Sequence, residues 1–330
     1  MDKKTVFSAI QPTGSIHIGN YLGAVKNWCK LQDEYNCYFA IADLHSLTTS
    51  LNSAASLLRS NIFDMYCMLL ACGLNTSQCT FFCQSGVVQH SQLAWVLNCY
   101  TQYGEAKRMT QFKDKSQKNS DNVNVGLFAY PILQAADILL YNAHYVPIGI
   151  DQKQHLELSR NIAERFNQRY SPTFNVPDLL IPKVGAKIFS LTEPLQKMSK
   201  SDENLNSYIL LTDDNDTIVR KIKRAVTDSG DRIEYSKDKP GLSNLLSIYC
   251  AFSECSPAKV VDIFESASYA QLKEELSALV VAHLEPIRTE YQRLKLEKTF
   301  IKRCMEEGAD KACHTAKKML DKVYKKVGLM

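Results

Sequence analysis

The chain has 330 residues, of which 39 are Lys or Arg and 35 are Asp or Glu, so its formal net charge is +4. This balance excludes a disordered tail and a protein that binds polyanions in bulk. No run approaches 18 apolar residues, and the first ten residues lack the apolar stretch of a signal peptide. We therefore expect a soluble, cytoplasmic protein that does not contact membranes, and the length suggests two domains.

The eleven cysteines form no CxxC pair, and most of them lie in apolar runs such as 79–83. Zinc and iron–sulfur sites are usually marked by short paired spacings. An odd number of cysteines without such pairs is typical of reduced core thiols in a cytoplasmic protein. We expect no structural metal and no iron–sulfur cluster.

Short apolar runs that suit β-strands alternate with helical periodicity through the first half of the chain. The predicted strands are 5–9, 36–42, 79–83 and 145–148. Helical spacing follows the first strand from Leu22 to Trp28, and a second helix ends at Gly73. This alternation predicts an α/β fold with a Rossmann-like, doubly wound parallel sheet. Ligands of such sheets bind beyond the carboxyl ends of the strands.

The second half is almost wholly helical from Thr217 onward, with Gly241 and Pro257 among the predicted breaks. We expect a Rossmann-like domain over 1–205 and a smaller helical domain over 206–330, whose last helix, about 296–330, can pack back on the first domain. Residues 288–330 carry 12 Lys or Arg and 6 Asp or Glu. This bias is typical of a solvated helix face, and it also fits a surface that binds an RNA backbone.

A glycine-containing segment, Gln11-Pro-Thr-Gly-Ser-Ile-His-Ile-Gly-Asn20, lies between the first strand and the first helix. Glycine allows a ligand to approach the backbone closely, and the start of a helix presents unpaired N–H groups to an anion. The segment is neither a Walker loop nor a GxGxxG turn. By itself it also fits an ordinary turn between a strand and a helix.

A second polar segment, Lys197-Met-Ser-Lys-Ser201, follows about 180 residues later. Two lysines three residues apart in a polar loop can hold phosphate oxygens as mobile charges. Together the two segments resemble the HIGH and KMSKS signatures of class I aminoacyl-tRNA synthetases, with Asn20 in place of the second histidine.

The resemblance extends to bacterial tryptophanyl-tRNA synthetases over nearly the whole chain. The segments that carry it follow the order of that family and are 12–24, 109–116, 130–141, 151–155, 197–202 and 225–229. The resemblance implies a Rossmann-like catalytic domain, a helical domain that binds the tRNA anticodon, and a homodimer. It also implies that the protein activates L-tryptophan with ATP and transfers it to the 3′ end of tRNA(Trp).

The resemblance further implies which residues hold ATP. Lys197, Lys200 and Lys113 would contact its phosphates and serve as the catalytic residues. The ATP-binding residues are Gln11, Pro12, Thr13, Gly19, Asn20, Gly149, Ile150, Asp151, Ile188, Lys197, Met198, Ser199, Lys200 and Ser201. Adenylate formation depends on positioning and charge stabilisation rather than on a side-chain base. Mg²⁺ would arrive with ATP, held mainly by phosphates and water, so we expect no dedicated metal ligands.

The tryptophan-binding residues implied by the resemblance are Asp137, Phe7, His45, Tyr130, Gln134, Val146, Ile148 and Gln152. Asp137 matters most, because the indole N–H can only donate and the pocket must supply an acceptor for it. A wrong substrate that leaves a buried acceptor unpaired is rejected about 10⁴-fold. Without the resemblance, an Asp within an apolar helix also fits a cap or an ion pair.

Two residues depart from the pattern of the family. Ile150 stands where a glutamate is usual, which removes a carboxylate beside the nucleotide. Gln134 stands where methionine often lies against the indole, which makes the wall of the pocket more polar.

Three other functions remain open from the sequence. A tyrosine-specific synthetase shares the fold and both signatures, although the segments between them follow the tryptophan branch. A small-molecule adenylyltransferase would share the nucleotide half but has no use for a basic helical domain. A synthetase paralogue kept as a binding or regulatory partner would not need Lys197, Lys200 and Asp137.

Overall fold

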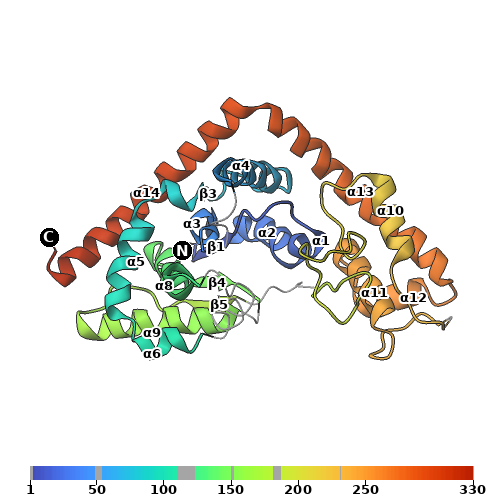
Figure 1. Ribbon diagram of the computed structural model, residues 1–330, viewed down its shortest axis with the longest axis horizontal. Helices are drawn as coiled ribbons and strands as arrows, with labels where there is room; N and C mark the ends of the chain where they lie inside the picture. The colour runs from blue at the N-terminus through green and yellow to red at the C-terminus, as the bar shows by residue number, and fades with distance from the viewer. Residues whose placement is uncertain are drawn as a thin grey trace.

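The computed structural model describes residues 3–48, 54–109, 123–149, 152–180, 187–230 and 232–329. It contains a five-stranded sheet in which all neighbours pair in parallel, in the order β3-β2-β1-β4-β5 (Figure 1). The strands are β1 Thr5–Ile10, β2 Asn36–Ile41, β3 Thr80–Cys83, β4 Tyr145–Pro147 and β5 Asp178–Leu180. The predicted doubly wound α/β fold is confirmed, and the strand order reverses between β1 and β4.

The first four strands match the predicted ones to within two residues. The fifth strand was not predicted. It has only three residues, Asp178-Leu-Leu, and none of them is β-branched or aromatic. Pairing with β4, rather than a local preference, makes this segment a strand.

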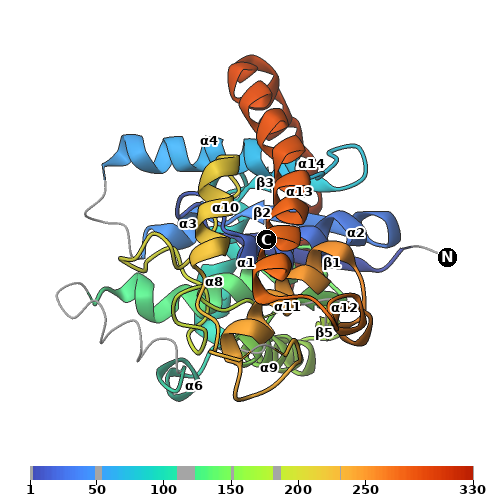
Figure 2. The same cartoon turned by 90° about the vertical axis from the view of Figure 1, so that its right-hand side faces the viewer.

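Helices follow the strands and cover both faces of the sheet (Figures 1 and 2). The helices of the sheet region are α1 Ile18–Asn20, the π-helix η1 Tyr21–Val25, α2 Lys26–Glu34, α3 Asp43–Ser46, α4 Ala55–Ala71, the 3₁₀-helix η2 Gln84–Gly86, α5 Gln89–Tyr100, α6 Tyr103–Lys107, α8 Val125–Leu140 and α9 Lys153–Arg169. Alternate strand residues enter two hydrophobic clusters: Val6 packs with α2 and α4, whereas Phe7 packs with α5, α8 and α9. This period of two puts Phe7 on the face that α8 covers.

The C-terminal part of the chain is helical, as the sequence predicts. Its helices are α10 Asn215–Arg224, α11 Pro240–Ser253, α12 Pro257–Ile263, α13 Tyr269–Leu296 and α14 Lys298–Val327. Helices α13 and α14 meet at an angle above α4, and α14 then runs along β3, α5 and α8 (Figure 1). The two-domain division at residue 205 stays a prediction.

The predicted break at Gly241 is wrong. Gly241 is buried in the first turn of α11, and non-helical segments lie before it, over residues 225–230 and 232–239. A Cβ on Gly241 would overlap the carbonyl oxygen of Val226. The glycine is therefore explained by the close approach of that backbone rather than by the end of a helix.

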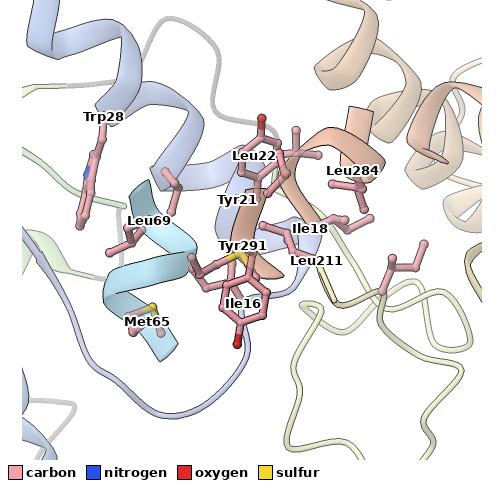
Figure 3. Close-up of a cluster of buried hydrophobic side chains, with 14 of the residues drawn as sticks. Ile16, Ile18, Tyr21, Leu22, Trp28, Met65, Leu69, Leu211, Leu284 and Tyr291 are labelled. Atoms are coloured by element: carbon pink, nitrogen blue, oxygen red, sulfur yellow. The ribbon is translucent and has the colours of Figure 1, made fainter. Parts of the chain in front are cut away.

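A cluster of buried side chains joins the sheet region to the helical region (Figure 3). Ile16 and Ile18 follow β1, Met65 comes from α4, and Leu284 and Tyr291 come from α13. Backbone hydrogen bonds from 211 N to 16 O and from 18 N to 209 O, both 2.9 Å long, hold the chain that follows the second signature beside the first. The two signatures are thus brought together by packing and pairing.

Five of the eleven cysteines are buried, five are partly buried, and Cys99 on α5 is exposed. The prediction of core thiols is therefore confirmed for the five buried cysteines and is wrong for Cys99. Among the helices in the described ranges, none is both long and apolar enough to cross a membrane.

Candidate active site

A cavity of about 290 Å³ lies between β1, β4 and α8. This is the point where the strand order reverses, and it is where doubly wound sheets bind their ligands. All eight residues of the predicted tryptophan set line the cavity; the others that line it are Ser8, Ala9, Gln11, Ala42 and Ile138. The structure thus brings the predicted set together, and its role in binding tryptophan stays a prediction.

Three lining residues come from one face of α8. Tyr130, Gln134 and Asp137 lie four and then three positions apart, which is the spacing of a single helix face. Phe7 reaches the same space from β1 and stacks on the ring of Tyr141, with 5.6 Å between ring centroids. The cavity is therefore formed by rigid elements rather than by loops alone.

The carboxylate of Asp137 is only 1% exposed and receives three hydrogen bonds. His45 Nε2 lies 2.8 Å from Oδ2, while Gln84 Nε2 and His90 Nδ1 lie 2.7 and 2.6 Å from Oδ1. Burial acts to raise the pKa of Asp137, but the hydrogen bonds and charges of His45 and His90 outweigh it and lower the pKa below its ordinary value. Asp137 is therefore an ionised acceptor in the cavity wall, and it also makes the ionic contacts that its place in an apolar helix suggested.

The opposite end of the cavity carries a linked group of polar side chains. Tyr130 Oη lies 2.9 Å from His155 Nε2, and His155 Nδ1 lies 2.9 Å from Gln152 Oε1. Burial raises the pKa of Tyr130 to about 12, so its hydroxyl stays protonated at neutral pH. This end can therefore both donate to and accept from a zwitterionic ligand.

The two signature segments meet at His17. The backbone N–H of Asn20 donates to His17 Nδ1 over 3.3 Å, so the ring caps the first helix. Burial, together with the charges of Lys200 and Lys197, lowers the pKa of His17 to about 4. Lys200 Nζ also donates to the carbonyl oxygen of Thr13, and burial lowers its pKa. Two cationic side chains thus face the segment that precedes α1.

Met198 anchors the second signature. Its side chain is 2% exposed, and its N–H donates to the carbonyl oxygen of Ile188 over 3.1 Å. Ser199 Oγ accepts from the N–H of Ser201 over 3.2 Å. Lys197 and Lys200 lie on either side of this buried anchor in the sequence, and Lys197 is exposed while Lys200 is partly buried.

The structure describes most, but not all, of the remaining residues of the predicted ATP set. Gln11 lines the cavity, Pro12 and Thr13 follow β1, Gly19 and Asn20 lie in α1, and Gly149 follows β4. Lys113, Ile150 and Asp151 lie outside the described residues. Within the described ranges, no group of three or more His, Cys, Asp or Glu side chains is arranged to hold a metal ion.

Gln84 and His90 contact Asp137 and were missed by the sequence analysis. Gln84 ends the apolar run 81–83, His90 lies within the polar run 89–92, and neither belongs to a recognisable motif. One signal was available: Gln84 follows directly after β3, at the same carboxyl edge of the sheet as the other site residues.

Comparisons with known proteins agree with this geometry. A family model described as tRNA synthetases class I (W and Y) matches residues 2–285. The tryptophan–tRNA ligase of Clostridium tetani is 46% identical over 329 residues, covering 100% of this chain and 97% of that protein.

Two crystal structures have the same fold over nearly the whole chain. Tryptophanyl-tRNA synthetase from Mycoplasma pneumoniae superposes with a TM-score of 0.90 and 34% identity, covering 100% of this chain and 99% of the other. The enzyme from Campylobacter jejuni, complexed with ADP and tryptophan, superposes with a TM-score of 0.84 and 30% identity, covering 98% of this chain and 99% of the other. With both signatures adjacent and a cavity at the reversal of strand order, the chain belongs to the class I tRNA synthetases for tryptophan and tyrosine, in the tryptophanyl-tRNA synthetase branch.

Proposed function

We propose that the protein is a tryptophan–tRNA ligase: it activates L-tryptophan with ATP and transfers the amino acid to the 3′ end of tRNA(Trp). The observation that carries the proposal is Asp137, an ionised carboxylate buried in the wall of a cavity at the reversal of strand order. The named relatives are tryptophan–tRNA ligases, which supports the same substrate here.

Tryptophan is selected by its indole N–H. With the ring between the apolar walls that Phe7, Val146 and Ile148 provide, the N–H donates to Asp137. Phenylalanine would leave the remaining acceptor position of this buried carboxylate unfilled, which costs it about 10⁴-fold in specificity. Tyr130 and Gln152, linked through His155, meet the amino and carboxylate groups at the opposite end.

In the first step the tryptophan carboxylate attacks the α-phosphorus of ATP, and pyrophosphate leaves. The reaction requires alignment and stabilisation of the negative charge on the phosphates. Lys197 and Lys200 supply that charge from the polar loop, with Lys200 moving from the carbonyl oxygen of Thr13 to a phosphate oxygen. MgATP is the substrate form, and phosphates and water hold most of the ion.

In the second step the terminal ribose of tRNA attacks the adenylate carbonyl, and AMP leaves. We assign the RNA-facing surface to the exposed lysines of α14, which are Lys298, Lys302, Lys311, Lys317, Lys318, Lys322, Lys325 and Lys326. Contacts with phosphates make binding weaken as salt rises. A tRNA KM that does not change between 50 and 200 mM salt would leave these lysines as a solvated helix face.

We also propose a cytoplasmic homodimer that uses the surface around α5. Val88 and Trp95 on or beside this helix, Tyr103 on α6 and Val125 on α8 are between 62% and 81% exposed. Exposed apolar residues gathered on adjoining elements mark interaction surfaces, and most soluble oligomers are two-fold symmetric. Sedimentation should give twice the chain mass, and Trp95→Asp should give the monomer.

The experiment that tests the proposed function is amino-acid-dependent exchange of pyrophosphate into ATP. L-Tryptophan should stimulate the exchange, and L-tyrosine should not. Stimulation by tyrosine alone would identify a tyrosine-specific synthetase. Adenylate formation without charging of any tRNA would instead identify a small-molecule adenylyltransferase.

A further inference from the structure

The carboxylate of Asp137 is held from two sides. His45, which lines the cavity, donates to Oδ2. Gln84 and His90 donate to Oδ1, and neither is among the residues that line the cavity. These two side chains are 1% and 0% exposed, so Oδ1 faces the protein interior and Oδ2 faces the cavity.

The number of acceptor positions on the carboxylate identifies the oxygen that is available to a ligand. Each carboxylate oxygen offers two lone pairs. Oδ1 uses both, for Gln84 Nε2 at 2.7 Å and His90 Nδ1 at 2.6 Å. Among the described residues, Oδ2 accepts from His45 alone, at 2.8 Å, so one acceptor position remains on the cavity side.

We infer that Gln84 and His90 are positioning residues for tryptophan selection: they occupy Oδ1 and thereby direct the remaining acceptor of Oδ2 at the indole N–H. This inference rests on the proposed role of Asp137. The terminal torsion of an aspartate is broad and has little preference of its own. The orientation of the carboxylate is therefore set by its donors, and losing a donor on Oδ1 lets the carboxylate rotate away from the ligand.

Both positioning residues are themselves fixed. His90 Nε2 lies 2.8 Å from Tyr141 Oη, which holds the ring with Nδ1 toward Asp137. Gln84 lies in η2, directly after β3, so the sheet sets its position.

Gln84 also carries an acceptor that folding does not explain. Its Oε1 is buried and has no hydrogen-bond partner among the described residues. Such an atom destabilises the folded chain, and methionine, which has a similar shape, would avoid that cost. The polar character of this side chain is therefore accounted for by the N–H that it donates to Asp137.

The test compares two substrates in pyrophosphate exchange by the full-length protein. One is L-tryptophan, and the other is β-(3-benzothienyl)-L-alanine, in which sulfur replaces the indole N–H. In Gln84→Met, the ratio of kcat/KM for tryptophan to that for the analogue should fall about tenfold, which is the effect of one hydrogen bond to a charged group. The change should appear in the tryptophan KM, while the ATP KM stays at the wild-type value. The melting temperature should be equal to or higher than that of the wild type.

Gln89→Met is the matched control. Gln89 is also buried, lies beside His90 in α5, and contacts Cys313 Sγ at 3.4 Å rather than Asp137. This variant should keep the wild-type substrate ratio. At the second position, His90→Leu should lower the ratio, and His90→Asn, which retains an amide donor near the place of Nδ1, should restore part of it.

Two results would overturn the inference. One is a wild-type substrate ratio in both Gln84→Met and His90→Leu. The other is an equal loss of activity toward both substrates, which is what a merely structural role produces. Asp137→Ala separates the two proposals: if it alone abolishes discrimination, only the positioning roles fail, and if it preserves discrimination, the proposed role of Asp137 fails as well.

Discussion

Gly308 lies where α14 closely approaches strand β3, and replacing it by alanine is a sharp test of the packing. A Cβ at this position would overlap the carbonyl oxygen of Phe81 in β3 and lie 3.0 Å from its carbonyl carbon. The helix would have to move by about 1.5 Å to bring the overlapping pair to the ordinary contact distance of 3.4 Å. The neighbour is backbone in a paired strand, so it cannot move aside as a flexible side chain could.

We expect Gly308→Ala to lower the free energy of unfolding by about 2 kcal/mol. Overpacking a close contact costs about 1–3 kcal/mol, and the better helix propensity of alanine returns up to about 1 kcal/mol. The upper end of the overpacking range applies, because the same carbonyl oxygen also accepts a 3.2 Å hydrogen bond from Tyr66 Oη. Moving α14 would disturb that bond too.

The assay is urea unfolding followed by the fluorescence of the buried Trp28. Gly104→Ala is the matched control, because a Cβ on Gly104, inside α6, would meet nothing within 4 Å. This variant should be as stable as the wild type, or more stable by up to about 1 kcal/mol. Equal unfolding midpoints for the two variants would refute the close approach of α14 to β3.

Three further predictions concern the site. Asp137→Ala should raise the tryptophan KM in pyrophosphate exchange about 10- to 100-fold, the loss expected for a hydrogen bond to a charged acceptor, and leave the ATP KM within about twofold; equal effects on both constants would show that Asp137 does not read the indole. Lys197→Ala should slow adenylate formation about 10²-fold in single-turnover measurements while tryptophan binding stays near normal, because the charge acts in the transition state; unchanged kinetics would remove Lys197 from the mechanism. The pKa of His17 is about 4 in the folded chain, against an ordinary value of 6.5 for histidine, so protonation favours the unfolded chain. The stability that this ring contributes is therefore present above pH 6.5 and is lost as the pH falls toward 4. When the pH is lowered from 7 to 4.5, the free energy of unfolding measured in urea should therefore fall less in His17→Gln than in the wild type, by up to about 3 kcal/mol. Equal falls in the two proteins would contradict the burial of a neutral ring.

Local patterns in the sequence were sufficient to predict four of the five strands of the sheet. The runs around Phe7 and Phe39 are apolar on both faces, as strands covered by helices on both sides must be. The strand Asp178–Leu180 was not predicted, because it forms through pairing with β4 and its sequence has no local strand pattern. Gly241 and Gly308 show the same limit, since in both cases glycine is required by a backbone distant in the sequence.

The candidate site divides in the same way. Asp137 and Tyr130 were named through whole segments that resemble a family, and the structure gathers them around one cavity. Gln84 and His90 could not be named, because their importance arises only when β3 and α5 bring them behind Asp137. The encounter of Lys200 with Thr13 likewise depends on the pairing that brings the two signatures together.

The central claim is that this cavity and these signatures serve to charge tRNA with tryptophan. The most direct measurement is aminoacylation of total tRNA by the purified protein with each of the amino acids in turn. We predict that tryptophan alone is attached, and that the charged species is tRNA(Trp). Charging with tyrosine, or no charging with any amino acid, would contradict the account.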